Sequence, residues 1–221
     1  PIDREGVANP IGVFVEPDPG EPTRYVPFLV QSGISLPDES YYRLENFAGT
    51  RERYREHVER MLALAGVADA AAQADRVVAL ETEIASHHWD NVRSRDAVAT
   101  YNLKSWDEVQ ALVGRDLTPW LEGVAPANPS AFAEVVAYQP SFLEGLGALL
   151  TEERVDDWKA WLRFKIVRAA APYLPEPFVQ ENFAFNGTEL TGVPEIRERW
   201  KRGIQLVNGS LGEAVGAIYV A

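Results

Sequence analysis

The chain has 221 residues, of which 46% are hydrophobic, and it carries a formal net charge of -12. This is enough apolar material for one large domain or two small ones, at about 100–200 residues per domain. There is no cysteine, which excludes disulfides, thiolate nucleophiles and cysteine-based metal sites. A nucleic-acid partner is disfavoured, because binding to phosphates requires a basic surface. No apolar run reaches about 18 residues, so we expect no transmembrane helix.

The first part of the chain is predicted to form a β-hairpin over about residues 11–31. Two runs rich in β-branched and aromatic residues, 11–15 and 25–30, flank the turn-forming stretch 17–22. Pro27 has no N–H to donate to a neighbouring strand. We therefore expect the second strand to lie at a sheet edge, at least locally.

From about residue 50 onward the hydrophobic period is that of α-helices. Thr50 is a candidate cap for a helix that ends at Gly66. The next helix contains Leu80, Glu81 and Ile84 on its apolar stripe. Ser105 and Glu108 match a capping box before a further helix.

The last third is also predicted to be helical. Thr151 is a candidate cap for a helix whose apolar stripe includes Lys165 and which Pro172 ends. Pro194 suits the first turn of another helix, and a final one is expected to start near Ser210. The fold class is therefore mostly α: a multi-helix domain with a small N-terminal β-hairpin, in one lobe over residues 1–221.

The histidines do not match a zinc-peptidase motif. His57 is far from His87, and the adjacent rings of His87 and His88 diverge on a helix. A zincin helix instead needs two histidines four residues apart with a glutamate between them. We expect His87 and His88 to be surface or partly buried residues at a helix end, although a site shared with a distant carboxylate stays open.

No other catalytic pattern is evident. The carboxylate pairs Glu81–Glu83, Glu152–Glu153 and Asp156–Asp157 are more simply explained as ordinary helix residues, because neighbouring side chains on a helix diverge. The sequence lacks a nucleophile elbow and both glycine-rich phosphate motifs. Gly145 and Gly147 lie among helical residues and indicate close packing or a bend. We therefore assign no catalytic, metal or substrate-binding residue.

Two other patterns have simple structural explanations. The glycosylation-type motifs at Asn186 and Asn208 are also Asn-Gly dipeptides, which favour turns. Most tryptophans occur at helical core spacing, which favours packing over a ligand-binding surface; they are Trp89, Trp106, Trp120, Trp158, Trp161 and Trp200.

Three stretches of the chain carry short motifs in a defined order. Residues 13–42 contain Gly33, Leu36-Pro37-Asp38 and Tyr41-Tyr42 after two strands. Residues 80–102 contain a helix ending in Glu-x-x-Ile-Ala, then Arg-Asp and Tyr-Asn pairs. Residues 199–220 contain an Arg-Trp run, an Asn, an Ala and a Gly before Tyr-Val. In order and spacing, almost from end to end, these stretches resemble the neprilysin-like zinc metallopeptidase family, and most closely its bacterial oligopeptidase O type.

This resemblance implies that the chain is an internal fragment of the family's non-catalytic N-terminal helical lobe. Such a lobe forms the wall of the cavity that admits short peptides, and it faces the catalytic lobe of the same protein. The zinc ligands and the glutamate base of the family are absent here, so the resemblance implies zinc in the parent enzyme and none in this chain. A hinge is expected near Gly209–Gly216.

Two alternatives remain open. The chain could be a free-standing helical protein-binding module, or a small hydrolase that uses carboxylates with His87 or His88. If it is a fragment, apolar surface that normally faces a partner lobe is exposed, and we expect self-association at high concentration.

Overall fold

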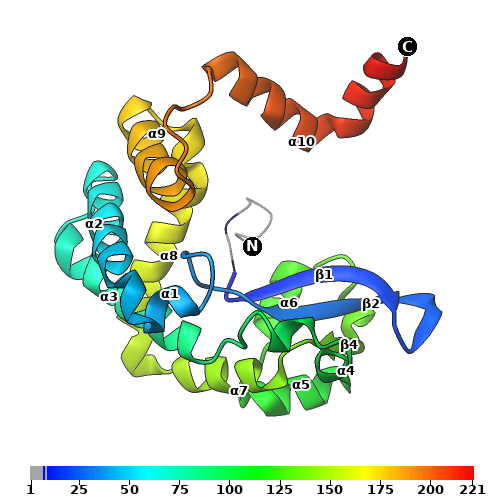
Figure 1. Ribbon diagram of the computed structural model, residues 1–221. Helices are drawn as coiled ribbons and strands as arrows, with labels where there is room; N and C mark the ends of the chain where they lie inside the picture. Colours follow the sequence, from blue (N-terminus) through cyan, green and yellow to red (C-terminus); the bar gives the residue numbers. More distant parts are fainter. Residues whose placement is uncertain (1–6, 8) are drawn as a thin grey trace.

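The computed structural model describes residue 7 and residues 9–221. Within this part the chain is mostly helical, with one small sheet near its N-terminal end (Figure 1). The sheet and helices α5 to α7 form one end of the molecule, helices α2, α3, α8 and α9 the other, and α10 extends away from both. The predicted fold class is therefore confirmed.

The sheet has four strands in the order β1-β2-β4-β3. The hairpin pairs β1, Ile11–Asp18, antiparallel with β2, Glu21–Gln31. The two further strands are β3, Leu103–Ser105, and β4, Glu134–Ala137. These two strands are too short to show an alternating pattern in the sequence, so they were not predicted.

The expectation of an edge position for β2 is confirmed only locally, at Pro27, and is wrong for the strand as a whole. This strand pairs with β1 on one side and, in parallel, with β4 on the other. Pro27 is tolerated because the pairing with β4 begins one residue later, at Phe28 and Leu29. The edge strands of the sheet are β1 and β3.

The turn of the hairpin is held by Asp18. Its carboxylate accepts hydrogen bonds from the Gly20 N–H at 2.8 Å and the Tyr101 hydroxyl at 2.7 Å, and it pairs with Arg24 at 2.7 Å. The hydrogen bond from Tyr101 is the main reason that the pKa of Asp18 falls to about 2. Tyr101 belongs to the Tyr-Asn pair of the second resembling stretch, so that pair anchors the hairpin.

The helices fill most of the remaining chain. They are α1 Ser40–Arg43, α2 Ala48–Leu64, α3 Ala70–Ser86, α4 Ala97–Thr100, α5 Trp106–Val113, α6 Thr118–Val124, α7 Pro140–Leu149, α8 Val155–Ala170, α9 Glu176–Phe183 and α10 Arg199–Val220. A π-helical segment, η7 Ala184–Glu189, follows α9 directly.

One predicted cap is confirmed and two are wrong. Ser105 and Glu108 form a complete capping box at the start of α5. Thr50 lies inside α2, which begins two residues earlier without a side-chain cap. Thr151 precedes the 3-10 turn Glu152–Arg154 rather than α8 itself, and its side chain does not cap that turn.

The C-terminal expectations also need correction. Pro194 lies in a non-helical connection, and α10 begins at Arg199. The helix expected near Ser210 is the second half of α10, which bends at Leu211 (φ -135°, ψ 36°). Asn186 and Asn208 lie in η7 and α10 instead of in turns. The helical context on both sides overrides the Asn-Gly preference.

The core consists of two main clusters of buried apolar residues. One lies between the sheet and helices α5, α7 and α8, and includes Leu29, Ile84, Val109 and Phe142. The other lies among α2, α3 and α8. Ile34 packs against both clusters, so the loop after β2 joins the two halves of the molecule.

Close helix packing explains the glycines of α7, as predicted. A Cβ atom at Gly145 would lie 2.3 Å from the His87 ring, and one at Gly147 would lie 1.9 Å from the Val113 carbonyl oxygen at the end of α5. Only glycine permits such an approach of α7 to α5.

We predict that Gly147→Ala lowers the free energy of unfolding by about 1–3 kcal/mol, because the methyl group forces α5 and α7 apart. Chemical denaturation would measure the loss. Gly203→Ala is the matched control, since a Cβ at Gly203 meets nothing within 4 Å. Equal stability of the two variants would contradict the packing argument.

Candidate functional site

The three histidines do not meet. His57 lies in α2 and is buried, with Nδ1 2.8 Å from Glu181 Oε1 and its ring stacked on Phe185. His88 places Nε2 3.0 Å from the Ser32 carbonyl oxygen and packs edge-on against Phe142. His87 packs against Gly145. His87 and His88 are half-buried at the end of α3, as expected.

His57 has one polar atom without a partner. Its Nε2 is buried and finds no hydrogen-bond partner among the described residues. Burial lowers the pKa of His57, and the contact with Glu181 only partly opposes this effect. Across residue 7 and residues 9–221, no group of three or more histidine, aspartate or glutamate side chains could hold a metal ion.

The carboxylate pairs diverge, as expected for helix neighbours. Glu83 pairs with Arg154 at 2.7 Å, and Asp157 pairs with Arg76 at 2.7 Å. Asp156 is exposed and lies 3.3 Å from Lys159. Glu83, Asp156 and Asp157 thus make different surface contacts, whereas Glu81 is buried.

Glu81 is buried together with the cation that balances its charge. It is 0% exposed, and its charge is met by Lys165 of α8, whose Nζ lies 2.9 Å from Oε1 and is itself 2% exposed. The Ser35 hydroxyl donates to Oε1 at 2.7 Å. Oε2 accepts from the hydroxyls of Tyr42 and Tyr54 at 2.7 and 2.8 Å and from the Ser35 N–H at 3.1 Å.

The charges of this cluster balance inside the protein. Burial alone raises the pKa of Glu81, but the Lys165 charge and the surrounding donors outweigh it and hold the pKa below its usual value. Burial lowers the pKa of Lys165, although Glu81 opposes this effect. A carboxylate with five donors has no free lone pair for chemistry, so the cluster is structural and not a catalytic dyad.

The cluster joins four segments that are distant in sequence. Glu81 lies on α3, Lys165 on α8, Tyr54 on α2, and Ser35 with Tyr42 in the segment after β2. The sequence reading placed both Glu81 and Lys165 on apolar stripes. Two opposite charges at core positions were the signal that could have predicted the pair, and that signal was missed.

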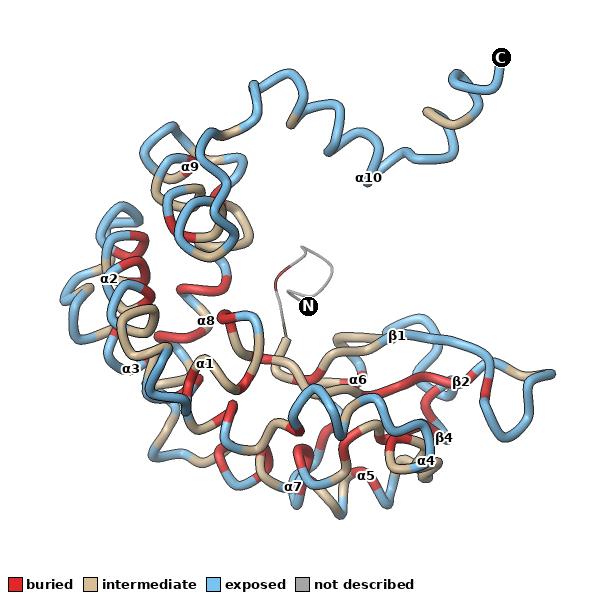
Figure 2. Tube along the Cα trace, in the orientation of Figure 1, coloured by how far each residue is buried: buried red, intermediate tan, exposed pale blue. Residues whose placement is uncertain are grey.

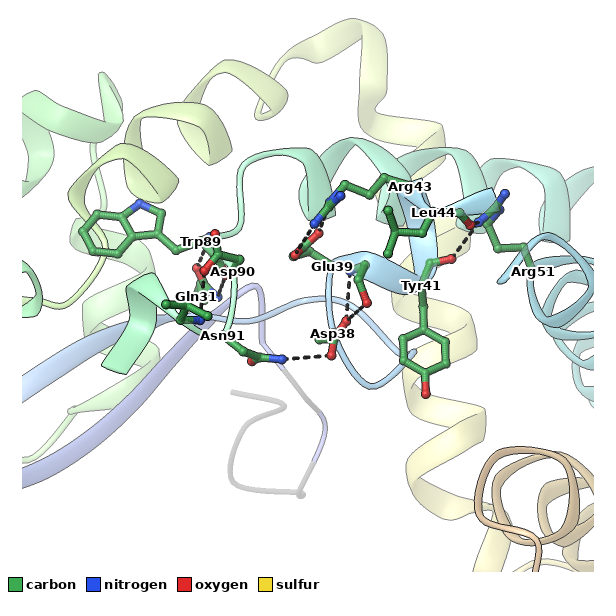
Figure 3. Close-up of polar contacts among 12 residues, drawn as sticks. Gln31, Asp38, Glu39, Tyr41, Arg43, Leu44, Arg51, Trp89, Asp90 and Asn91 are labelled. Atoms are coloured by element: carbon green, nitrogen blue, oxygen red, sulfur yellow. Dashed lines mark hydrogen bonds and ion pairs between the residues drawn. The ribbon is translucent and has the colours of Figure 1, made fainter. Parts of the chain in front are cut away.

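A polar network on the neighbouring loops fixes the same region (Figure 3). The Gln31 side chain donates to the Trp89 carbonyl at 2.9 Å and accepts from the Trp89 N–H at 2.7 Å. Asp38 accepts from Asn91 at 3.0 Å and from the Ser40 N–H at 2.9 Å. These bonds tie the end of β2 and the start of α1 to the loop after α3.

Arginines complete the network around α1. Arg43 pairs with Glu39 at 2.6 Å. Arg51 donates to the carbonyl oxygens of Tyr41 and Leu44 at 3.0 and 2.7 Å (Figure 3). The residues of the first resembling stretch therefore make structural contacts that connect β2, α1 and the loop after α3.

The tryptophans pack as expected, with one exception. Trp89 and Trp161 are buried, Trp106 stacks on Trp120 at 6.1 Å, and Trp158 lies edge-on to Trp161 at 5.5 Å. Trp200 on α10 is 61% exposed. Helix α10 carries the third resembling stretch and buries no residue (Figure 2).

A groove of about 1030 Å³ separates α10 from the segment 172–179. Tyr173, Leu174 and Val179 line one side, and Arg202 and Leu206 of α10 line the other. The surface of this groove is mixed apolar and basic.

We predict that Glu81→Gln lowers the free energy of unfolding by about 3–5 kcal/mol, because it leaves the buried Lys165 charge unpaired. Glu83→Gln, two residues along the same helix, should lose at most about 1 kcal/mol, since its partner Arg154 is at the surface. The double variant Glu81→Gln/Lys165→Met should recover most of the loss. A similar loss for Glu81→Gln and Glu83→Gln would refute the central role of the pair.

The pH dependence of this loss has a defined sign. The pKa of Glu81 is lower in the folded protein than in the unfolded one. The ionised carboxylate therefore contributes fully to the free energy of unfolding above the unfolded pKa of about 4.3, and this contribution is lost as the pH falls through the folded pKa. The difference in the free energy of unfolding between the unsubstituted chain and Glu81→Gln, measured by denaturation, should therefore shrink below about pH 4.

A family model described as "Peptidase family M13" matches residues 2–221. The chain is 25% identical to a neutral endopeptidase of Lactobacillus helveticus over 83% of its length, and 24% identical to human neprilysin over 95%. It spans only 28% and 30% of the length of these two relatives.

Solved structures of two bacterial proteins are also similar to this chain. The zinc metalloprotease Zmp1 of Mycobacterium tuberculosis, in complex with an inhibitor, is 43% identical, with a TM-score of 0.94 over 99% of this chain and 34% of its own. PepO of Lactobacillus rhamnosis shares the fold, with a TM-score of 0.79 at 23% identity. The chain belongs to peptidase family M13, of which it represents part of the N-terminal region.

Proposed function

We propose that this chain is the non-catalytic lobe of a zinc metalloendopeptidase that cleaves short peptides. In this role it forms one wall of the substrate cavity, limits access to it, and faces the catalytic lobe of the same protein. The observation that carries the proposal is the agreement with Zmp1, a zinc metalloprotease, over nearly the whole chain at 43% identity.

The rigidity of the fold supports a steric role. The Glu81 cluster and the loop network around Asp38 hold the sheet, α1, α3 and α8 in one arrangement. A wall that selects substrates by size needs such a fixed shape, because a deformable wall would also admit folded proteins. Zinc would be bound by the catalytic lobe.

The bend in α10 supports a hinge in the region expected from the sequence. Leu211 leaves the helical conformation between Gly209 and Gly212, and neither glycine has a neighbour that a Cβ atom would meet within 4 Å. A change of backbone angles there would move the last part of α10 without disturbing the core.

A comparison of the isolated chain with its parent polypeptide would test the function. We predict that the isolated chain neither cleaves peptides nor forms a tight stoichiometric zinc complex. The parent should cleave unstructured peptides, with kcat/KM falling as the peptide lengthens, and should spare folded proteins. Fluorogenic peptide assays and zinc titration are the measurements.

Two results would count against the proposal. A tight zinc site in the isolated chain would contradict the non-catalytic assignment. Cleavage of a folded protein by the parent as fast as its unfolded form would contradict the access role.

A further inference from the structure

We infer that the apolar seam of α10, defined as Trp200, Ile204, Val207 and Leu211, is a docking surface for the rest of the same polypeptide. The inference rests on the proposed function, since it requires that the chain be part of a longer M13 enzyme. The inference goes beyond the proposed function because it names the surface of α10 that contacts the rest of the polypeptide and the kind of side chains that would cover it.

The sequence of α10 is that of an interior helix. The seam residues follow one another at steps of four, three and four, which places them on one side of a helix. After Arg202, the only charged residue up to Ala221 is Glu213. A surface helix normally carries many more charges on its outer side.

The described structure leaves this seam in water. The seam residues are 61%, 51%, 46% and 60% exposed, in chain order, and α10 has no buried residue (Figure 2). An isolated helix has little stability in water, and tertiary packing of an apolar face normally supplies it. The contacts that hold α10 therefore come from outside the described residues.

Relatives show where such contacts could arise. The superposition on Zmp1 covers 99% of this chain with a TM-score of 0.94, so it includes α10, and it uses only 34% of the Zmp1 chain. Helix α10 thus keeps its extended position in a much longer polypeptide. This favours the remaining part of the parent chain as the occupant over a second copy of this segment.

The groove beside α10 indicates the chemistry of the occupant. It borders the side of α10 that carries Arg199, Arg202 and Leu206, and Tyr173 across the groove is 67% exposed. Since Leu206 and Val207 point about 100° apart on a helix, the occupant can contact α10 from more than one side. Apolar side chains with acidic residues at the basic rim would complement this surface.

Hydrogen exchange in the parent polypeptide tests the inference. We expect the amides of residues 199–211 to exchange rapidly in the isolated chain at low concentration and to be protected in the parent. In the parent, Val207→Asp should lower Tm by about 2 °C, because it places a charge in a packed interface and a given loss of stability shifts Tm less in a longer chain. Asn208→Asp is the matched control: it adds the same charge on the next residue, outside the seam.

Three results would overturn the inference. The seam could exchange as fast in the parent as in the isolated chain, or Val207→Asp could be no more destabilising than Asn208→Asp. The parent could also be a dimer that Val207→Asp dissociates with loss of protection, which would make a second copy the occupant. An active, size-selective parent with an unprotected α10 would refute this inference alone, whereas an inactive parent with a protected α10 would refute only the proposed function.

Discussion

The charge of Glu81 is the constraint on which the rest of the structure depends. An ionised carboxylate without contact to water is costly to bury unless charges and donors surround it. Here Lys165 supplies the charge, and Ser35, Tyr42 and Tyr54 supply the donors. Because the donors come from three segments and Glu81 lies on a fourth, the carboxylate fixes where α2, α3, α8 and the segment after β2 can lie.

The same constraint explains what the family-like residues do. Gly33 adopts φ 95°, which glycine tolerates best, and its carbonyl oxygen accepts from Trp161 at 2.9 Å. Asp38 caps the turn into α1, and Tyr42 reaches Glu81. The resembling stretches therefore hold separate segments of this chain together.

Helix α10 is the opposite case. It bears a family-like stretch, yet its apolar side chains contact little of the described chain. The buried cluster around Glu81 and the uncovered α10 therefore differ in what holds them in place. One end of the described chain is held together by its own side chains, whereas α10, as we infer, is held by the rest of the polypeptide.

The sequence alone determined the helical class, the hairpin, the capping box at Ser105 and the family, because these depend on local periodicity, turn chemistry and ordered motifs. Only the tertiary structure decided the central position of β2, the short strands β3 and β4, and the pairing of Glu81 with Lys165. The physical reason is distance along the chain. Two opposite charges on apolar stripes indicate that each needs a buried partner, but only the fold decides that these two residues, more than eighty positions apart, lie opposite each other.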